Sequence, residues 1–141
     1  MRNPTAPRER GSLRALLLVL VLATGACEEE NTLDPSLIDV TELQDIFTFE
    51  VHGLDQVTDA ERYLWVMTGD QATVEVTSGL TGGSAFLQIR GGNGEVVYGE
   101  DIQAEVDGVT EVNTSGIWQI DVVFEKASGE FGFALERDTI P

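Results

Sequence analysis

The side chains in this sequence that could carry out chemistry are one thiol, one imidazole and many carboxylates. Cys27 is the only cysteine and His52 the only histidine among 141 residues, whereas Asp and Glu together number 25. A thiol can act as a nucleophile, a metal ligand or the attachment point of a lipid. An imidazole can act as a general base, and clustered carboxylates supply the hard oxygen ligands that calcium prefers.

Cys27 follows a segment with the three parts of a secretory signal peptide. Four arginines (positions 2, 8, 10 and 14) precede the apolar run from Ala15 to Ala23, and small residues then lead to Cys27. The apolar run is shorter than the roughly 20 residues that a membrane-spanning helix needs. We therefore expect residues 1–26 to be a signal peptide that is removed by cleavage between Ala26 and Cys27.

The segment Thr24-Gly25-Ala26-Cys27 resembles the lipobox of bacterial lipoproteins, whose commonest form is Leu-Ala-Gly-Cys, with Thr24 in place of the leucine. The resemblance implies covalent lipid, such as palmitate, on Cys27 and an anchor in the outer membrane, at the cell surface or on the periplasmic face. Two or three acyl chains would hold the protein stably on a bilayer. The alternative is an ordinary secretory signal followed by an unpaired thiol, which is a liability in an oxidising compartment.

The charge of the mature chain excludes one class of partner. Removal of residues 1–26 leaves four basic and 24 acidic residues, a formal net charge of −20. Nucleic acid binding needs clustered Lys and Arg to neutralise phosphates, so we exclude it. Solubility is the simplest explanation of this acidity, and the sequence does not indicate an oligomeric state.

Residues 27–44 are expected to form a lipidated cysteine and a flexible acidic tether. Glu28, Glu29 and Glu30 follow Cys27 directly, and a polar stretch without a clear period continues to Gln44. Such a tether of 17 residues would reach at most roughly 60 Å. The three glutamates also resemble the export signal of surface lipoproteins in some Gram-negative lineages, although solvation of the tether explains them equally well.

Residues 45–141 are predicted to form one all-β domain, an antiparallel, jelly-roll-like β-sandwich of about eight strands. Apolar and polar residues alternate with a period of two, and Gly, Asn and Asp recur about every ten residues. We expect a hairpin at Gly91–Gly94, a turn at Val106–Val109, and a second hairpin in which Lys126–Gly129 joins the two clearest strands. The alternating runs are 47–51, 63–67, 72–76, 85–89, 95–98, 102–106, 109–112, 118–124 and 131–135.

Three of these stretches resemble the bacterial pre-peptidase C-terminal domain, a small β-sandwich found on secreted enzymes. They are residues 69–76, 115–122 and 128–135, which are similar to the glycine-initiated and closing strands of that family. The acidic pair that the family often carries is replaced by Gly83-Ser84-Ala85-Phe86-Leu87-Gln88. The resemblance implies the fold and a non-catalytic, adhesive or accessory role.

The remaining candidates for chemistry are few. His52 is expected to be structural rather than a general base. Trp65 and Trp118 are expected in the core, with an exposed sugar-binding platform beside Tyr63 or Tyr98 as the alternative. Weak candidates for calcium ligands are Glu100, Asp101, Glu105 and Asp107, with Asp55, Asp59 and Glu61 in another loop. No EF-hand spacing is present, so solvated loop acids are the simpler interpretation and we assign no metal.

The sequence therefore predicts a non-enzymatic, lipid-anchored envelope protein that acts as a binding or structural module with a protein or glycan partner. The first alternative is a calcium-stabilised surface adhesion module, and a small hydrolase is a distant third. No cofactor other than the covalent lipid is expected.

Overall fold

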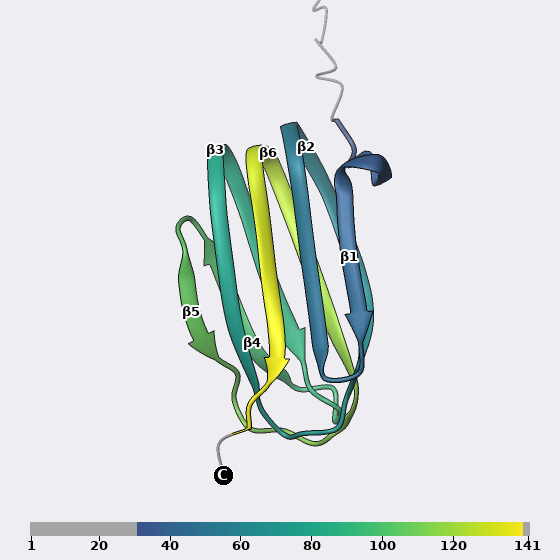
Figure 1. The fold of residues 1–141 in the computed structure, drawn as a ribbon. Coiled ribbons are helices and arrows are strands. Elements are labelled where there is room, and N and C mark those ends of the chain that lie inside the picture. Colours follow the sequence, from purple (N-terminus) through teal and green to yellow (C-terminus); the bar gives the residue numbers. More distant parts are fainter. Residues whose placement is uncertain (1–30, 140–141) are drawn as a thin grey trace, which may run out of the picture.

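A computed structural model describes residues 31–139, which form one antiparallel sheet folded over into a two-layer sandwich (Figure 1). Its elements are the 3-10 turn η1 (Pro35–Leu37) and the strands β1 (Ile38–Leu43), β2 (Ile46–Met67), β3 (Ala72–Arg90), β4 (Val96–Ile102), β5 (Val106–Val109) and β6 (Gly116–Arg137). The strand order is β1-β2-β6-β3-β4, and β5 pairs with β3. The predicted all-β sandwich is confirmed. Within 31–139 no helix is long and apolar enough to cross a bilayer.

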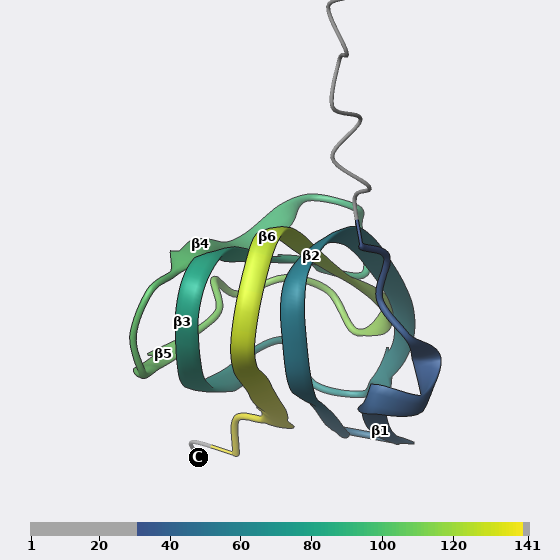
Figure 2. The ribbon, with the colours of Figure 1, turned by 90° about the horizontal axis from the view of Figure 1, so that it is seen from above.

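Three strands run through both layers. β2, β3 and β6 contain 22, 19 and 22 residues, and each arches over one end of the molecule (Figures 1 and 2). The rings of Phe47 and Tyr63 belong to the same strand, yet their centroids lie 5.4 Å apart because the strand has turned back across the core. The front layer in Figure 1 holds the first halves of β2 and β3, the second half of β6, and β1 and β5.

The arches are made by residues with left-handed backbone conformations. Gly53 (φ 70°) and Gln56 (φ 49°) lie in β2, Gly83 (φ 67°) in β3, and Lys126 (φ 47°) and Gly129 (φ 110°) in β6. The pairing registers shift at the same level in all three strands. Bulges of this kind re-aim a strand without ending it. We call this end of the sandwich, residues 53–56, 80–83 and 126–129, the bend end, and the opposite end the turn end.

The structure corrects the predicted strand count and one hairpin. Residues 31–139 contain six strands rather than about eight, because three pairs of alternating runs are halves of long strands. Lys126–Gly129 is not a hairpin. Phe124 and Phe131 face each other edge to face across the core, 5.8 Å apart, instead of pairing side by side. Residues 106–109 are strand β5 rather than a turn, whereas the hairpin at Gly91–Gly94 between β3 and β4 is confirmed.

The predicted tether is wrong for the part of it that the structure describes. Ile38–Leu43 is strand β1, in register with Ile46–Val51 of β2. Leu33 is buried in the core, and its backbone N–H donates to the Asp59 carboxylate at 2.9 Å. The folded domain thus includes residues 31–44, and only residues 27–30 of the expected tether lie outside the described residues. The weak alternation of an edge strand explains why its pattern was missed.

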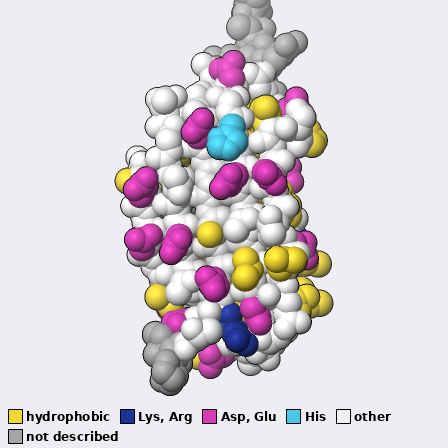
Figure 3. Space-filling view, in the orientation of Figure 1, with side chains coloured by type: hydrophobic (Ala, Val, Ile, Leu, Met, Phe, Trp, Pro, Cys, Tyr) yellow, Lys and Arg dark blue, Asp and Glu magenta, His cyan; other side chains and the backbone are white. Residues whose placement is uncertain are grey.

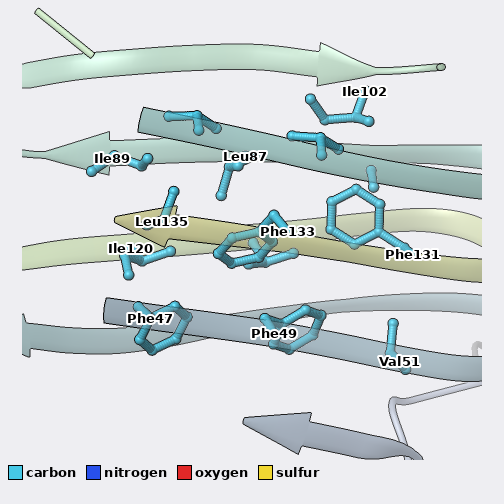
Figure 4. Close-up of a cluster of buried hydrophobic side chains, with 14 of the residues drawn as sticks. Phe47, Phe49, Val51, Leu87, Ile89, Ile102, Ile120, Phe131, Phe133 and Leu135 are labelled. Atoms are coloured by element: carbon cyan, nitrogen blue, oxygen red, sulfur yellow. The ribbon is translucent and has the colours of Figure 1, made fainter. Parts of the chain in front are cut away.

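Aromatic and aliphatic side chains from both layers fill the core (Figure 4). Phe49 stacks on Phe133 at 5.3 Å within the front layer and meets Phe124 of the back layer at 6.4 Å. Near the turn end, Trp65 and Trp118 pack edge to face at 6.0 Å. These side chains occupy the inward positions of alternating strands, and the aromatic contacts between Phe49 and Phe124 and between Phe124 and Phe131 help to join the two layers.

Asp45 closes the β1–β2 turn and gives the fold a pH dependence. Burial acts to raise the pKa of Asp45, but the Thr68 N–H and hydroxyl donate to its carboxylate at 2.6 and 2.7 Å. Arg137 lies 3.5 Å away. The hydrogen bonds and this charge outweigh burial, so the pKa of Asp45 lies below its ordinary 3.8.

A pKa lower in the folded than in the unfolded chain stabilises the fold above the unfolded pKa, and this stabilisation disappears as pH falls through the folded pKa. We therefore expect Asp45→Asn to be less stable than the wild type at pH 7, with the difference shrinking below about pH 4. Urea unfolding between pH 2 and 7 measures this difference. Asp39→Asn, on the exposed face of β1, controls for loss of a negative charge. A difference independent of pH would contradict the assignment.

Candidate functional site

The outer face of the front layer is hollowed along its central strand. Phe131, Phe133 and Leu135 of β6 point into the core, so Gly132 and Ala134 face outward. These two residues carry almost no side chain, and the strands on either side of β6 are about 10 Å apart. The result is a hollow of about 350 Å³, which we call the β6 groove.

The walls of the β6 groove come from β2 and β3. Gly132 lies between Glu50 and Thr77 in the ladder, and Ala134 lies between Thr48 and Glu75. Each row therefore places one carboxylate and one hydroxyl on opposite sides of a small residue. A methyl group on Gly132 would lie 3.1 Å from the Phe49 carbonyl oxygen, so the backbones pack closely at the floor.

His52 lies at the end of the groove nearest the bend end. Its Nε2 is 3.8 Å from a Glu50 carboxylate oxygen, and its Nδ1 is 3.6 Å from one of Glu130. The three side chains are 62%, 64% and 67% exposed. Figure 3 shows the acidic side chains and the histidine around a pale central strip. Carboxylates beside an imidazole can orient it, and all three of these side chains remain largely in contact with water.

The β6 groove is rich in hydrogen-bond acceptors. Glu50, Glu75, Glu105 and Glu130 contribute carboxylates that only accept, and Thr48 and Thr77 contribute hydroxyls that both donate and accept. Such a lining suits a ligand that carries many hydroxyl donors or a positive charge. It disfavours anions, because the whole surface is acidic.

Sequence reasoning missed this groove. The signal was present in the strand 131–135, where Gly132 and Ala134 alternate with large apolar residues instead of with large polar ones. This pattern predicts a groove only when the strands on either side of residues 131–135 are known. Glu50, Glu75 and Glu130 come from three strands and are 25 or more residues apart in sequence.

The tryptophans form no sugar-binding platform. Trp65 and Trp118 are fully buried, which confirms the predicted core position, and their indole N–H groups donate to the carbonyls of Leu43 and Thr114. Tyr63 packs against Phe47. Burial of the Tyr63 side chain, together with the nearby Glu61 carboxylate, raises the pKa of Tyr63 to about 12. Burial, helped by Glu100, also raises the pKa of Tyr98.

The acids proposed as calcium candidates do not converge. Glu100 and Asp101 lie on β4. Asp107 lies on β5, where it is the register partner of Glu75 in β3, and Glu105 lines the β6 groove. Among residues 31–139, no group of three or more His, Cys, Asp or Glu side chains is arranged to hold a metal ion. Ala26 and Cys27 lie outside the described residues, so the cleavage and lipidation sites stay predictions.

The outer face of the back layer has a second hollow of about 400 Å³. Its polar groups bind one another. Arg62 Nε donates to Asp121 Oδ1 at 2.6 Å, and the Gln119 amide donates to Oδ2 at 2.7 Å, while Arg90 donates to Gln88 at 3.3 Å. Because both oxygens of Asp121 already accept hydrogen bonds, the β6 groove is the stronger candidate site.

Comparison with known proteins gives distant structural similarity only. No protein-family model matches the chain, and no curated protein matches it. The TmCBM61 structure with β-1,4-galactotriose is similar, with 15% identity, a TM-score of 0.40, and coverage of 74% of this chain and 85% of that one. CsCBM6-3 from Clostridium stercorarium with cellobiose has 14% identity, a TM-score of 0.31, and coverage of 79% and 91%. Such scores carry no argument about ligand or site, and the likeness to pre-peptidase C-terminal domains stays a prediction.

Proposed function

We propose that this protein is a non-catalytic, lipid-anchored module of the cell envelope that binds a neutral glycan in the β6 groove. The observation that carries the proposal is the arrangement of Thr48–Ala134–Glu75 and Glu50–Gly132–Thr77, in which acceptors flank a backbone floor. Sugar hydroxyls are hydrogen-bond donors that match such walls. The small floor residues leave space for a chain of sugar rings to lie along β6.

The neutral character of the glycan follows from electrostatics. The mature chain carries a formal net charge of −20, and four glutamates line the groove itself. An anionic polysaccharide would be repelled by this negative charge. A neutral glycan meets no such barrier, and each carboxylate-to-hydroxyl hydrogen bond is stronger than a neutral one.

Exposure argues against hydrolysis in the groove. A glycosidase needs one carboxyl kept protonated by an apolar or crowded environment and a second at a set separation. Glu50 and Glu130 are 64% and 67% exposed to water. This environment suits binding, and we propose no reaction.

Filling the groove should remove binding. We expect Ala134→Leu to lower the affinity for a bound glycan at least about tenfold, because the larger side chain occupies the floor. Glu75→Gln should lower it about three- to tenfold, since a hydrogen bond to a charged group contributes roughly 1.5–3 kcal/mol and one to a neutral group about 0.5–1.5 kcal/mol. The measurement is isothermal titration of the detergent-solubilised protein with neutral oligosaccharides, including β-1,4-galactotriose and cellobiose, after an array has identified the tightest binder.

The matched controls make the same chemical changes elsewhere. The control variants are Ala60→Leu and Glu111→Gln. Ala60 lies on the exposed face of the back layer, and Glu111 lies in the loop after β5. Both should bind as the wild type does. Equal loss in the controls, or unchanged binding by Ala134→Leu, would place the site outside the groove. No binding to any glycan of the array would overturn the proposal.

A further inference from the structure

The chain leaves the folded domain at the bend end, four residues after Cys27. Asn31 Nδ2 donates to the Asp55 carbonyl at 2.9 Å, and the Asn31 carbonyl accepts from the Thr58 N–H at 2.9 Å. Two residues on, Leu33 is buried in the core. Asn31 is therefore fixed to the arch of β2, at the top of the sandwich in Figure 1.

The covalent distance from the anchor to this point is short. Four peptide units join the Cα atoms of Cys27 and Asn31, and a fully extended chain spans at most about 3.6 Å per residue. Asn31 can therefore lie no further than about 14 Å from the Cα of Cys27. The predicted tether would have allowed roughly 60 Å and any orientation of the domain.

We propose that the bend end faces the lipid surface and that the turn end points away from it. This inference rests on the lipid anchor at Cys27 that forms part of the proposed function. The back-layer half of β2 alone, nine residues from Asp59 to Met67, is about 30 Å long. The turn end therefore stands about 30 Å further from the membrane than the bend end.

The chemistry of the two ends agrees with this orientation. Near Asn31, a surface hollow at the bend end is lined by the polar and acidic groups of Thr32, Asp34 and Asp55 together with Leu37 and Val57. Such a surface fits the hydrated headgroups and does not insert among acyl chains. Ten large apolar side chains among the described residues are exposed, and eight of them lie at the turn end: Leu43, Ile46, Leu64, Val66, Val96, Val109, Val112 and Ile117.

Single-site labelling of the anchored protein tests the orientation. The sequence has one cysteine, and acylation removes its thiol, so an introduced cysteine can be labelled alone. A fluorophore is attached to Thr81→Cys at the bend end or to Val112→Cys at the turn end, both exposed positions. The acylated protein is reconstituted in phosphatidylcholine vesicles containing a nitroxide-headgroup lipid. We expect at least about threefold stronger quenching at position 81 than at position 112.

Two controls separate the possible failures. Flotation with the vesicles tests the anchor: the wild type should float, and Cys27→Ala should not. If the wild type does not float, the anchor and this inference both fail. Flotation with equal or reversed quenching overturns the orientation alone. Insertion of 20 Gly/Ser residues after Glu30 should remove the difference between the two positions, because the longer link frees the domain. Glycan binding, measured separately, is unaffected by any of these outcomes.

Discussion

Gly83→Ala should destabilise the fold strongly. Gly83 has φ 67°, and an added Cβ would overlap the carbonyl oxygens of Lys126 and Glu125. These atoms belong to the backbone of β6 and cannot move without opening the arch. Left-handed strain contributes about 1–2 kcal/mol and overpacking about 1–3 kcal/mol. We expect a total loss of about 2–5 kcal/mol, against a usual stability of about 5–15 kcal/mol.

The chain offers a closely matched control for this variant. Gly53 has φ 70° in the arch of β2, but an added Cβ would meet nothing within 4 Å. Gly53→Ala should therefore pay the conformational cost alone, about 1–2 kcal/mol. Urea unfolding followed by circular dichroism measures both variants. Equal losses would mean that β3 and β6 do not approach as closely at the bend as the structure shows.

Phe49→Ala should destabilise the sandwich by about 3–5 kcal/mol, the range for removing a buried aromatic ring. Phe49 is fully buried and contacts the rings of Phe131 and Phe133 in the front layer and of Tyr63 and Phe124 in the back layer. Its removal leaves a cavity between the layers that the stiff strands cannot close. Chemical denaturation gives the free energy of unfolding, and Phe49→Leu should recover part of the loss.

Exposed apolar residues provide the comparison for Phe49. Leu64 is 55% exposed on the outer face of the back layer, so Leu64→Ala should change stability by no more than about 0.5 kcal/mol. A loss for Phe49→Ala as small as that for Leu64→Ala would show that the two layers are not joined through this ring.

The β6 groove shows why sites of this kind escape sequence reasoning. Alternation predicts that Gly132 and Ala134 face away from the core, and this is confirmed. Whether they form the floor of a groove depends on which strands lie beside β6, and their partners in β3 and β2 are 55 to 86 residues away in sequence. Pairing between distant strands leaves no local pattern, so Thr48 and Glu75 could not be recognised as facing one another.

The sequence by itself determined the period-two alternation, and with it the all-β class, the inward positions of Trp65, Trp118 and the phenylalanines other than Phe86, and the hairpin at Gly91–Gly94. It also carries the prediction of a lipidated Cys27. These properties depend on residues that are close along the chain, where the types of neighbouring side chains decide which face is buried.

Only the tertiary structure decided how the alternating runs are joined. Lys126–Gly129 has the composition of a hairpin turn, and glycine with positive φ serves a bulged arch equally well. The choice depends on whether Phe124 and Phe131 pair side by side or meet across the core, and that depends on β2 and β3 arching at the same level. The same non-local packing drew residues 31–44 into the domain, because Leu33 and β1 gain burial and backbone pairing that no local pattern encodes.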